Sequence, residues 1–226
     1  MFIITGASEG LGLELAKLLV GKKKKVVCLS RHMPHLPEIE WLQTDLTEEI
    51  SVEAAAKQVL SRDEPIEALV NCAGVMGYET AGKRLDYAEL ERLFQTNILG
   101  SILLTTRLLD RIKRDAGDIV NVASTVGTRA NEETRSAYAV SKWAMRGYST
   151  NLQLQLKETP CRVISFCPGG FQSRIAEKVT GEPLTDPENW MRAEDVAQCL
   201  LQIMELPKNM QVTEILIDRK KPGTFK

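Results

Sequence analysis

The segment Tyr138–Lys142 (YAVSK) holds two side chains that could share acid–base chemistry. On a helix, a spacing of four residues places the phenol and the ammonium on the same face. A phenol with a pKa near 10 must lose about three pKa units to act as a base near neutrality, or roughly 4 kcal/mol. A cation about 4 Å away at an effective dielectric near 20 supplies about that much. The pair predicts a tyrosine that takes a proton from an alcohol and returns it to a forming alkoxide.

Two further polar residues could complete this site, because a Tyr–Lys pair alone arises too easily by chance. Ser124 stands directly after a predicted strand and could hydrogen-bond the substrate oxygen, although a serine there could also simply cap the turn. Asn97 is a polar residue on the apolar face of a predicted helix, where an amide needs partners. A structural asparagine satisfied by its neighbours is the alternative for Asn97.

A glycine-rich turn, Thr5–Gly12 (TGASEGLG), leaves the first predicted strand and opens the first predicted helix. Glycines permit positive φ and close approach of a pyrophosphate, while the helix start offers free N–H groups and partial positive charge. The spacing G-x-x-x-G-x-G differs from the commoner G-x-G-x-x-G fingerprint, and tight packing without a ligand is the alternative. The turn and its position indicate a dinucleotide site.

The end of the second predicted strand discriminates between the two nicotinamide cofactors. Ser30 and Arg31 stand there, and no carboxylate does. An acidic residue would hold the ribose 2′-hydroxyl of NAD(H), whereas an arginine accepts the 2′-phosphate of NADP(H) in a charge-assisted pair. Glu9 in the glycine turn argues the other way, because its carboxylate could repel that phosphate. The sequence favours NADP(H) over NAD(H).

Short β-rich runs alternate with longer helical patterns along the whole chain. The predicted strands are Phe2–Thr5, Lys25–Ser30, Glu40–Gln43, Ala68–Asn71, Asp118–Val122, Arg162–Phe166 and Glu214–Ile217. The predicted helices are Leu11–Val20, Ser51–Leu60, Tyr87–Arg114, Ser136–Lys157 and Ala193–Met204. This alternation predicts an α/β protein with a doubly wound, Rossmann-type parallel sheet of about seven strands, helices on both faces, and a single domain over residues 1–226.

Two connections depart from the alternation. Prolines at positions 34 and 37 make a helix improbable between the second and third strands. Residues 171–190 contain Gly181, Pro183 and Pro187 and are too long for an ordinary connector, so we expect a substrate lid there. Ligands of open parallel sheets bind beyond the carboxyl ends of the strands, where most of the polar candidates stand.

Composition excludes several other classes. The near balance of 29 Lys+Arg against 30 Asp+Glu argues against nucleic-acid binding. No apolar run approaches the roughly 18 residues of a membrane span, and no cleavable leader is evident, so a cytoplasmic protein is expected. Neither a disulfide framework nor a metal site is expected from the scattered cysteines. These are Cys28, Cys72, Cys161, Cys167 and Cys199.

Together the motifs resemble the short-chain dehydrogenase/reductase family, in its NADP(H)-preferring form, over essentially the whole chain. The matching positions are Thr5-Gly6-x-x-x-Gly10-x-Gly12, Asp45-Leu46, Asn71-x-Ala73-Gly74, Asn97, Ser124, Tyr138-x-x-x-Lys142 and Pro168-Gly169. The resemblance implies the strand order 3-2-1-4-5-6-7 and an Asn–Ser–Tyr–Lys tetrad. In it, Tyr138 is the acid/base and Ser124 positions the carbonyl. Lys142 binds the nicotinamide ribose and lowers the tyrosine pKa, and Asn97 holds a water of the proton relay.

The resemblance also implies the cofactor contacts. Asp45 would reach the adenine, and Ser173 would contact the carboxamide. The full set expected to bind the cofactor is Gly6, Ser8, Gly10, Leu11, Gly12, Ser30, Arg31, Asp45, Leu46, Asn71, Ala73, Gly74, Tyr138, Lys142, Pro168, Gly169, Phe171 and Ser173. The two long helices suit the family's dimer-forming bundle, so a homodimer is expected, with a homotetramer as the alternative.

The sequence thus predicts an oxidoreductase that transfers hydride between NADP(H) and a carbonyl/secondary-alcohol substrate, with Tyr138 as acid/base. One alternative is a non-catalytic NADP(H)-binding sensor or scaffold on the same fold. Another is a nucleotide-sugar epimerase or dehydratase, but the chain after Lys142 leaves no room for the substrate domain of those relatives. Apolar residues of the lid fit a moderately hydrophobic carbonyl or ordinary packing. A 3-oxoacyl thioester, a sugar, a steroid-like ketone and a pterin all remain open.

Overall fold

The computed structural model describes residues 1–77, 85–129, 136–184 and 186–220. Within them, seven parallel strands form one sheet in the order β3-β2-β1-β4-β5-β6-β7. The strands are β1 (Phe2–Thr5), β2 (Val26–Ser30), β3 (Glu40–Gln43), β4 (Ala68–Asn71), β5 (Asp118–Val122), β6 (Val163–Pro168) and β7 (Glu214–Ile217). The fold class and strand order expected from the sequence are confirmed.

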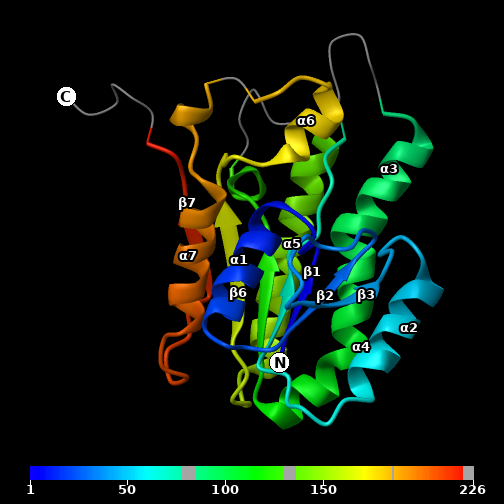
Figure 1. The fold of residues 1–226 in the computed structure, drawn as a ribbon, viewed down its shortest axis with the longest axis vertical. Helices are drawn as coiled ribbons and strands as arrows, with labels where there is room; N and C mark the ends of the chain where they lie inside the picture. Colours follow the sequence, from blue (N-terminus) through cyan, green and yellow to red (C-terminus); the bar gives the residue numbers. More distant parts are fainter. Residues whose placement is uncertain (78–84, 130–135, 185, 221–226) are drawn as a thin grey trace.

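Helices cover both faces of the sheet (Figure 1). The first and last long helices, α1 (Gly10–Gly21) and α7 (Ala193–Met204), pack together on one face. The opposite face carries α2 (Glu49–Leu60), α4 (Gly100–Asp115) and α5 (Ser136–Leu156). The sheet is therefore doubly wound, with one apolar core on each side.

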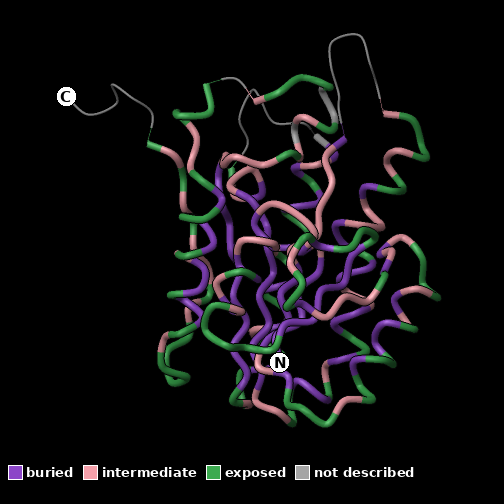
Figure 2. Tube along the Cα trace, in the orientation of Figure 1, coloured by how far each residue is buried: buried purple, intermediate pink, exposed green. Residues whose placement is uncertain are grey.

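Adjacent residues of the central strands serve these two cores in turn. Ile4 of β1 packs into the core with Leu15 of α1 and Leu200 of α7. Its neighbour Ile3 points to the other face and packs with Leu104 of α4. Every residue of β1, β2, β4, β5 and β6 is buried, as their nearly continuous apolar runs predict. Figure 2 shows this buried layer running through the middle of the molecule.

Two elements differ from the sequence prediction. The predicted helix Tyr87–Arg114 is interrupted, because a π-helical segment (Gln95–Leu99) separates α3 (Tyr87–Phe94) from α4. Such π-turns are common at functional sites, and this one contains Asn97. The segment 171–190 also contains a short helix, α6 (Arg174–Thr180), and a 3₁₀ turn at Pro187–Asn189, whereas the sequence indicated a loop. Residue 185 lies outside the described part of the segment. As predicted, no helix joins β2 to β3.

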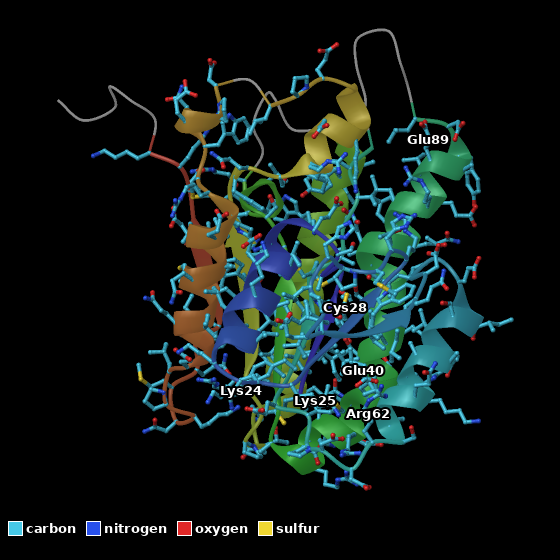
Figure 3. The ribbon with its side chains drawn as sticks, in the orientation of Figure 1. Lys24, Lys25, Cys28, Glu40, Arg62 and Glu89 are labelled. Atoms are coloured by element: carbon cyan, nitrogen blue, oxygen red, sulfur yellow. The ribbon has the colours of Figure 1, made fainter. Side chains whose placement is uncertain are left out.

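The amino end of the sheet carries surface ion pairs. Figure 3 shows Lys25, Glu40 and Arg62 grouped there. Lys25 Nζ lies 3.9 Å from a Glu40 carboxylate oxygen, and Arg62 also pairs with Glu40. Exposed pairs of this kind contribute about 0–1 kcal/mol each. None of the three lines the large cavity of the molecule, which opens at the other end of the sheet. In the described residues, no helix is long and apolar enough to span a bilayer.

Candidate active site

A cavity of about 740 Å³ opens beyond the carboxyl ends of the strands. Its wall includes residues that directly follow β1, β2, β4, β5, β6 and β7, as expected for a ligand site in an open parallel sheet. All of the predicted catalytic and cofactor-binding residues line this cavity except two, Asn71 and Asn97. The topology thus brings together groups that are as much as 167 residues apart, from Gly6 to Ser173.

The glycine turn has the geometry of an anion cradle. Gly6 and Gly10 have φ of 71° and 57°, in the left-handed region that favours glycine. A Cβ on Gly12 would lie 2.7 Å from the carbonyl oxygen of Gly6, so helix and turn approach too closely for a side chain. Glu9, the N-cap residue of α1, makes no side-chain cap hydrogen bond. The N–H groups of the first helical turn, without a capping side chain, therefore suit a pyrophosphate.

Thr5 fixes this turn against the next strand of the sheet. Its Oγ1 accepts hydrogen bonds from the backbone N–H groups of Cys72 and Ala73, both at 3.0 Å. A Cβ on Gly6 would lie 2.8 Å from the Ala73 Cα, which shows how close the two loops are. The turn after β1 and the loop after β4 consequently form one continuous wall of the cavity.

The carboxylate of Glu9 forms an ion pair with Lys178 of α6. Because both residues line the cavity, the pair joins the glycine turn to the segment 171–190. The base of that segment is closed by a bridge between Phe171 and Met191, with Gln172 N–H donating to Met191 O at 2.8 Å. The repulsion expected between Glu9 and a cofactor phosphate is thereby reduced, because an ammonium offsets its charge.

The residues at the end of β2 leave one cation exposed to the cavity. The Ser30 hydroxyl donates to the carbonyl of His32 at 2.7 Å and is buried. Arg31 is exposed and lines the cavity, and it forms no ion pair within the described residues. Asp45, which follows the neighbouring strand β3, accepts hydrogen bonds from Thr47 N–H at 2.9 Å and Thr47 Oγ1 at 2.8 Å. The Arg31 guanidinium, predicted to bind the 2′-phosphate, is therefore free to do so within the described residues.

Tyr138 and Ser124 meet in the cavity wall. Burial raises the pKa of Tyr138 to about 12, and a hydrogen bond with the Ser124 hydroxyl partly opposes that rise. Ser124 Oγ also donates to the carbonyl of Pro168 at 3.3 Å, linking the end of β5 to the end of β6. The stable form of the phenol at neutral pH is the protonated one.

Lys142 lies one helical turn from Tyr138 on α5, and its Nζ is 5.8 Å from the tyrosine ring centroid. The ammonium donates to the carbonyl of Val122 at 3.0 Å, and burial lowers its pKa to about 8. The predicted shared face is confirmed. The net fall expected for the tyrosine pKa is not found, because burial disfavours the charged phenolate and raises the pKa of Tyr138.

Gly74 makes room for the ammonium. A Cβ at this position would lie 3.3 Å from Lys142 Nζ and 3.6 Å from Asn97 Oδ1. A side chain at this position would therefore press on the ammonium and contact the amide, so a glycine suits the close approach of two polar side chains.

The amide of Asn97 is fully engaged inside the protein. Its Oδ1 accepts from Val75 N–H at 2.8 Å, and its Nδ2 donates to Val75 O at 2.9 Å and to Ser141 Oγ at 3.0 Å. The side chain is completely buried and does not line the cavity. Asn97 therefore fastens the π-helical segment to the loop after β4 and to α5, which corresponds to the structural alternative considered for it.

Asn71 also points away from the cavity. Its Nδ2 donates to Asn121 Oδ1 at 2.8 Å and to Thr105 Oγ1 at 3.0 Å. Asn121 donates in turn to Ser149 Oγ at 3.0 Å. This buried chain of amides and hydroxyls ties β4 and β5 to α4 and α5, so the Asn71 side chain supports the sheet beneath the site.

Several cavity residues are absent from the predicted set. Lys178 pairs with a residue 169 positions away, which local spacing cannot reveal. Arg129, Asp218 and Arg219 also line the cavity. The last two directly follow β7, so the rule that ligand sites lie beyond strand ends could have identified them.

Comparison with known proteins places this architecture. A sequence profile described as short chain dehydrogenase matches residues 1–183. The chain is 28% identical over 229 residues to an uncharacterized oxidoreductase of Staphylococcus haemolyticus, with 95% of each chain covered. The closed form of serine dehydrogenase complexed with NADP+ has a TM-score of 0.84 at 23% identity, covering 96% of this chain and 94% of that one. The 3-ketoacyl-(acyl-carrier-protein) reductase from Brucella melitensis, complexed with NADH, has a TM-score of 0.84 at 21% identity and covers 96% of both chains.

The seven-stranded sheet and the cavity at its carboxyl end define a Rossmann-type nucleotide-binding oxidoreductase. The chain belongs to the short-chain dehydrogenase family, because the family profile covers most of its length. The two structural likenesses lie below 25% identity and establish the fold alone.

Proposed function

We propose that the protein is an NADP(H)-dependent oxidoreductase that transfers hydride between the cofactor and a carbonyl/secondary-alcohol substrate, with Tyr138 as acid/base. One observation carries the proposal. A phenol, a hydroxyl and an ammonium, from Tyr138, Ser124 and Lys142, line the same cavity as the glycine turn and Arg31. A protein that only bound the cofactor would have no need of the phenol and the hydroxyl together.

The side chains support the following roles. Bound NADPH would supply the hydride, with its pyrophosphate at the glycine turn. Ser124 holds the substrate carbonyl oxygen, and Tyr138, protonated because its pKa is raised to about 12, donates its proton to that oxygen as negative charge develops. Lys142 holds the ribose hydroxyls, and its charge stabilises the phenolate that remains. In the oxidative direction, the phenolate takes the proton from the alcohol.

Three observations support NADP(H) as the cofactor. Arg31 is exposed to the cavity, no carboxylate stands beside it at the end of β2, and Glu9 is paired with Lys178. The fold does not decide the choice, because one structural neighbour is complexed with NADP+ and another with NADH. The charge at the end of β2 therefore carries the preference.

Arg31→Ala is expected to weaken NADPH binding about ten- to hundredfold and to leave NADH binding nearly unchanged. A charge-assisted hydrogen bond to the 2′-phosphate is worth roughly 1.5–3 kcal/mol, and NADH lacks that phosphate. Fluorescence titration of both cofactors measures the two affinities. Arg107→Ala is the matched control, because Arg107 pairs with Glu53 on the surface and does not line the cavity. Tighter NADH binding that ignores Arg31 would contradict the NADP(H) assignment.

Lys178→Ala is expected to weaken both cofactors about two- to fivefold, because it leaves the Glu9 carboxylate unpaired beside the pyrophosphate cradle. The effect is small because both side chains are partly exposed. The double variant with Glu9→Gln should recover the wild-type affinities. Titration with NADPH and NADH tests this directly. A loss that persists in the double variant would mean that Lys178 itself contacts the cofactor.

The same titrations and a screen of carbonyl compounds with NADPH test the function as a whole. Turnover of at least one carbonyl supports the oxidoreductase. Tight NADPH binding without turnover would favour the sensor or scaffold. The segment 171–190 is proposed as the lid over the substrate side of the cavity, since Phe171, Leu184 and Trp190 line it.

We also propose a homodimer that uses the outer face of α5. Val140, Trp143 and Leu154 of this helix are 55%, 48% and 66% exposed, and their spacing places them on one helix face, as in an apolar contact patch. Sedimentation velocity measures the oligomeric state. We expect Leu154→Lys to shift the monomer–dimer equilibrium toward the monomer.

A further inference from the structure

Four side chains at the mouth of the cavity come from three separate segments. Arg129 follows the helical turn Thr125–Gly127, Trp190 ends the proposed lid, and Asp218 and Arg219 directly follow β7. All four line the same cavity as the tyrosine and serine of the proposed proton-transfer site. They follow strands β5, β6 and β7, whereas Arg31 follows β2, which lies on the other side of the sheet.

A chain of contacts ties this group to Ser124. The serine donates to the carbonyl of Pro168 at 3.3 Å. The next residue, Gly169, lies against the Asp218 carboxylate, so a Cβ there would collide with it. Asp218 in turn forms an ion pair with Arg129. The segment that follows β7, which also carries Arg219, therefore contacts the loop after β6 beside the carbonyl that Ser124 binds.

Arg219 is the cation of this group that an aromatic ring holds in place while no described carboxylate pairs with its charge. Its guanidinium Cζ lies 4.3 Å from the centroid of the Trp190 ring, a cation–π contact. A contact of the guanidinium with a ring face uses none of its N–H groups as donors to an oxygen, so these remain for a bidentate pair with a carboxylate. Within the described residues, no carboxylate pairs with this guanidinium.

The other described cations of the cavity have a carboxylate partner or a proposed cofactor role, so Arg219 is the one that could bind a charged group of the substrate. Among the described residues, each carboxylate that lines the cavity is engaged: Glu9 with Lys178, Asp45 with Thr47 and Asp218 with Arg129. Arg31 and Lys142 are assigned to the cofactor phosphate and ribose. Arg174 lies 3.5 Å from Glu177 of its own helix. Within the part of the chain that the structure describes, the substrate side of the mouth therefore carries a positive charge that no carboxylate compensates.

We propose that the substrate is an oxo acid or hydroxy acid whose carboxylate is bound by Arg219 on its Trp190 platform, while its carbonyl or alcohol oxygen lies at Ser124 and Tyr138. This inference rests on the proposed function, because it places the reacting oxygen at that pair. The aromatic ring beneath the guanidinium adds an apolar surface for the carbon skeleton. Arg219 is thus a specificity-determining residue.

Matched aldehydes test the proposal. The probes are 4-carboxybenzaldehyde and its methyl ester, methyl 4-formylbenzoate, which differ chiefly in the negative charge. With NADPH, we expect the wild type to have a kcat/KM about ten- to hundredfold higher for the acid, because one charge-assisted pair is gained. In Arg219→Gln that advantage should disappear, mostly through KM, with the ester within about twofold of wild type. Arg219→Lys should recover part of it.

A binding measurement makes the test independent of turnover. Terephthalate has the carboxylate but no reducible carbonyl, and its binding to the NADPH-loaded protein can be followed by tryptophan fluorescence. We expect Arg219→Gln to weaken it about tenfold or more. Arg192→Gln is the matched control, since Arg192 is exposed, pairs with Asp195 and does not line the cavity.

The outcomes separate the two proposals. Equal kcat/KM for acid and ester in the wild type, or equal losses for both in Arg219→Gln, would overturn the carboxylate site and leave the oxidoreductase intact. If neither aldehyde reacts, terephthalate binding that depends on Arg219 still supports the site, while the proposed function fails. If neither aldehyde reacts and terephthalate does not bind, or binds equally well to Arg219→Gln, the carboxylate site is overturned as well.

Discussion

Tyr138→Phe is expected to reduce turnover about 10²- to 10⁴-fold while changing NADPH affinity less than about twofold. The substitution removes one oxygen from a residue whose hydroxyl meets Ser124 in the cavity wall. The phenol is protonated at neutral pH because its pKa is raised to about 12, so it is the acid that reduction of a carbonyl requires. Single-turnover kinetics with NADPH and an aldehyde measure the chemical step, and fluorescence titration measures the affinity.

Tyr148→Phe is the matched control. Tyr148 lies on the same helix, and burial also raises its pKa, but its hydroxyl contacts Thr105 and Thr106 and it does not line the cavity. Its loss should leave turnover within a few-fold of wild type. Full turnover in Tyr138→Phe would rule out the proposed mechanism. If Tyr138→Phe lost both NADPH binding and turnover, the phenol would instead have a role in binding the cofactor.

The fold was predictable because its strongest signals are local. Runs such as Phe2–Thr5 and Asp118–Val122 are too short for helices and apolar at nearly every position, which is typical of strands covered on both faces. Helix α6 was not predicted because it has only seven residues and lies between Ser173 and Gly181 in a segment rich in breakers. The π-helical segment was missed because it shifts the helix by a single residue, which a periodicity of three and four tolerates.

The candidate site was predictable where one segment carries the chemistry. Tyr138 and Lys142 share a helix face, and the glycine turn contains its own positive φ values. Interactions between distant segments were not predictable. The Glu9–Lys178 pair weakens the argument that Glu9 repels the cofactor phosphate, and it depends on where helix α6 lies relative to the glycine turn.

Burial changed the electrostatic argument in the same way. Spacing predicts that Lys142 is near Tyr138, but spacing says nothing about how much water reaches either group. The pKa of Lys142 falls to about 8 and that of Tyr138 rises to about 12, because desolvation by burial is the largest cause of both shifts. The pair therefore starts from a neutral phenol beside an ammonium that titrates just above neutrality.

Lys142→Met is expected to lower turnover about 10²- to 10³-fold and, unlike Tyr138→Phe, to weaken NADPH binding as well. The ammonium both stabilises the developing phenolate and holds the ribose, so one substitution removes both effects. Methionine has a similar length and suits a buried position. Because the folded pKa lies below the unfolded value, the wild type gains stability as pH rises from about 8 to 10.5, and the variant should lose that dependence. Denaturant titration at several pH values checks this.

Deprotonation of Lys142 should also make the wild-type reaction depend on pH. An amine is charged below its pKa, so kcat/KM for NADPH, which reports the free enzyme, should fall as pH rises through about 8. The phenol, with a pKa near 12, stays protonated over this range and cannot produce the fall. Lys142→Met should be slow and insensitive to pH there. Lys142→Arg, whose guanidinium stays charged, should move the fall beyond pH 10. A fall near pH 8 that persists in Lys142→Met would assign it to another group.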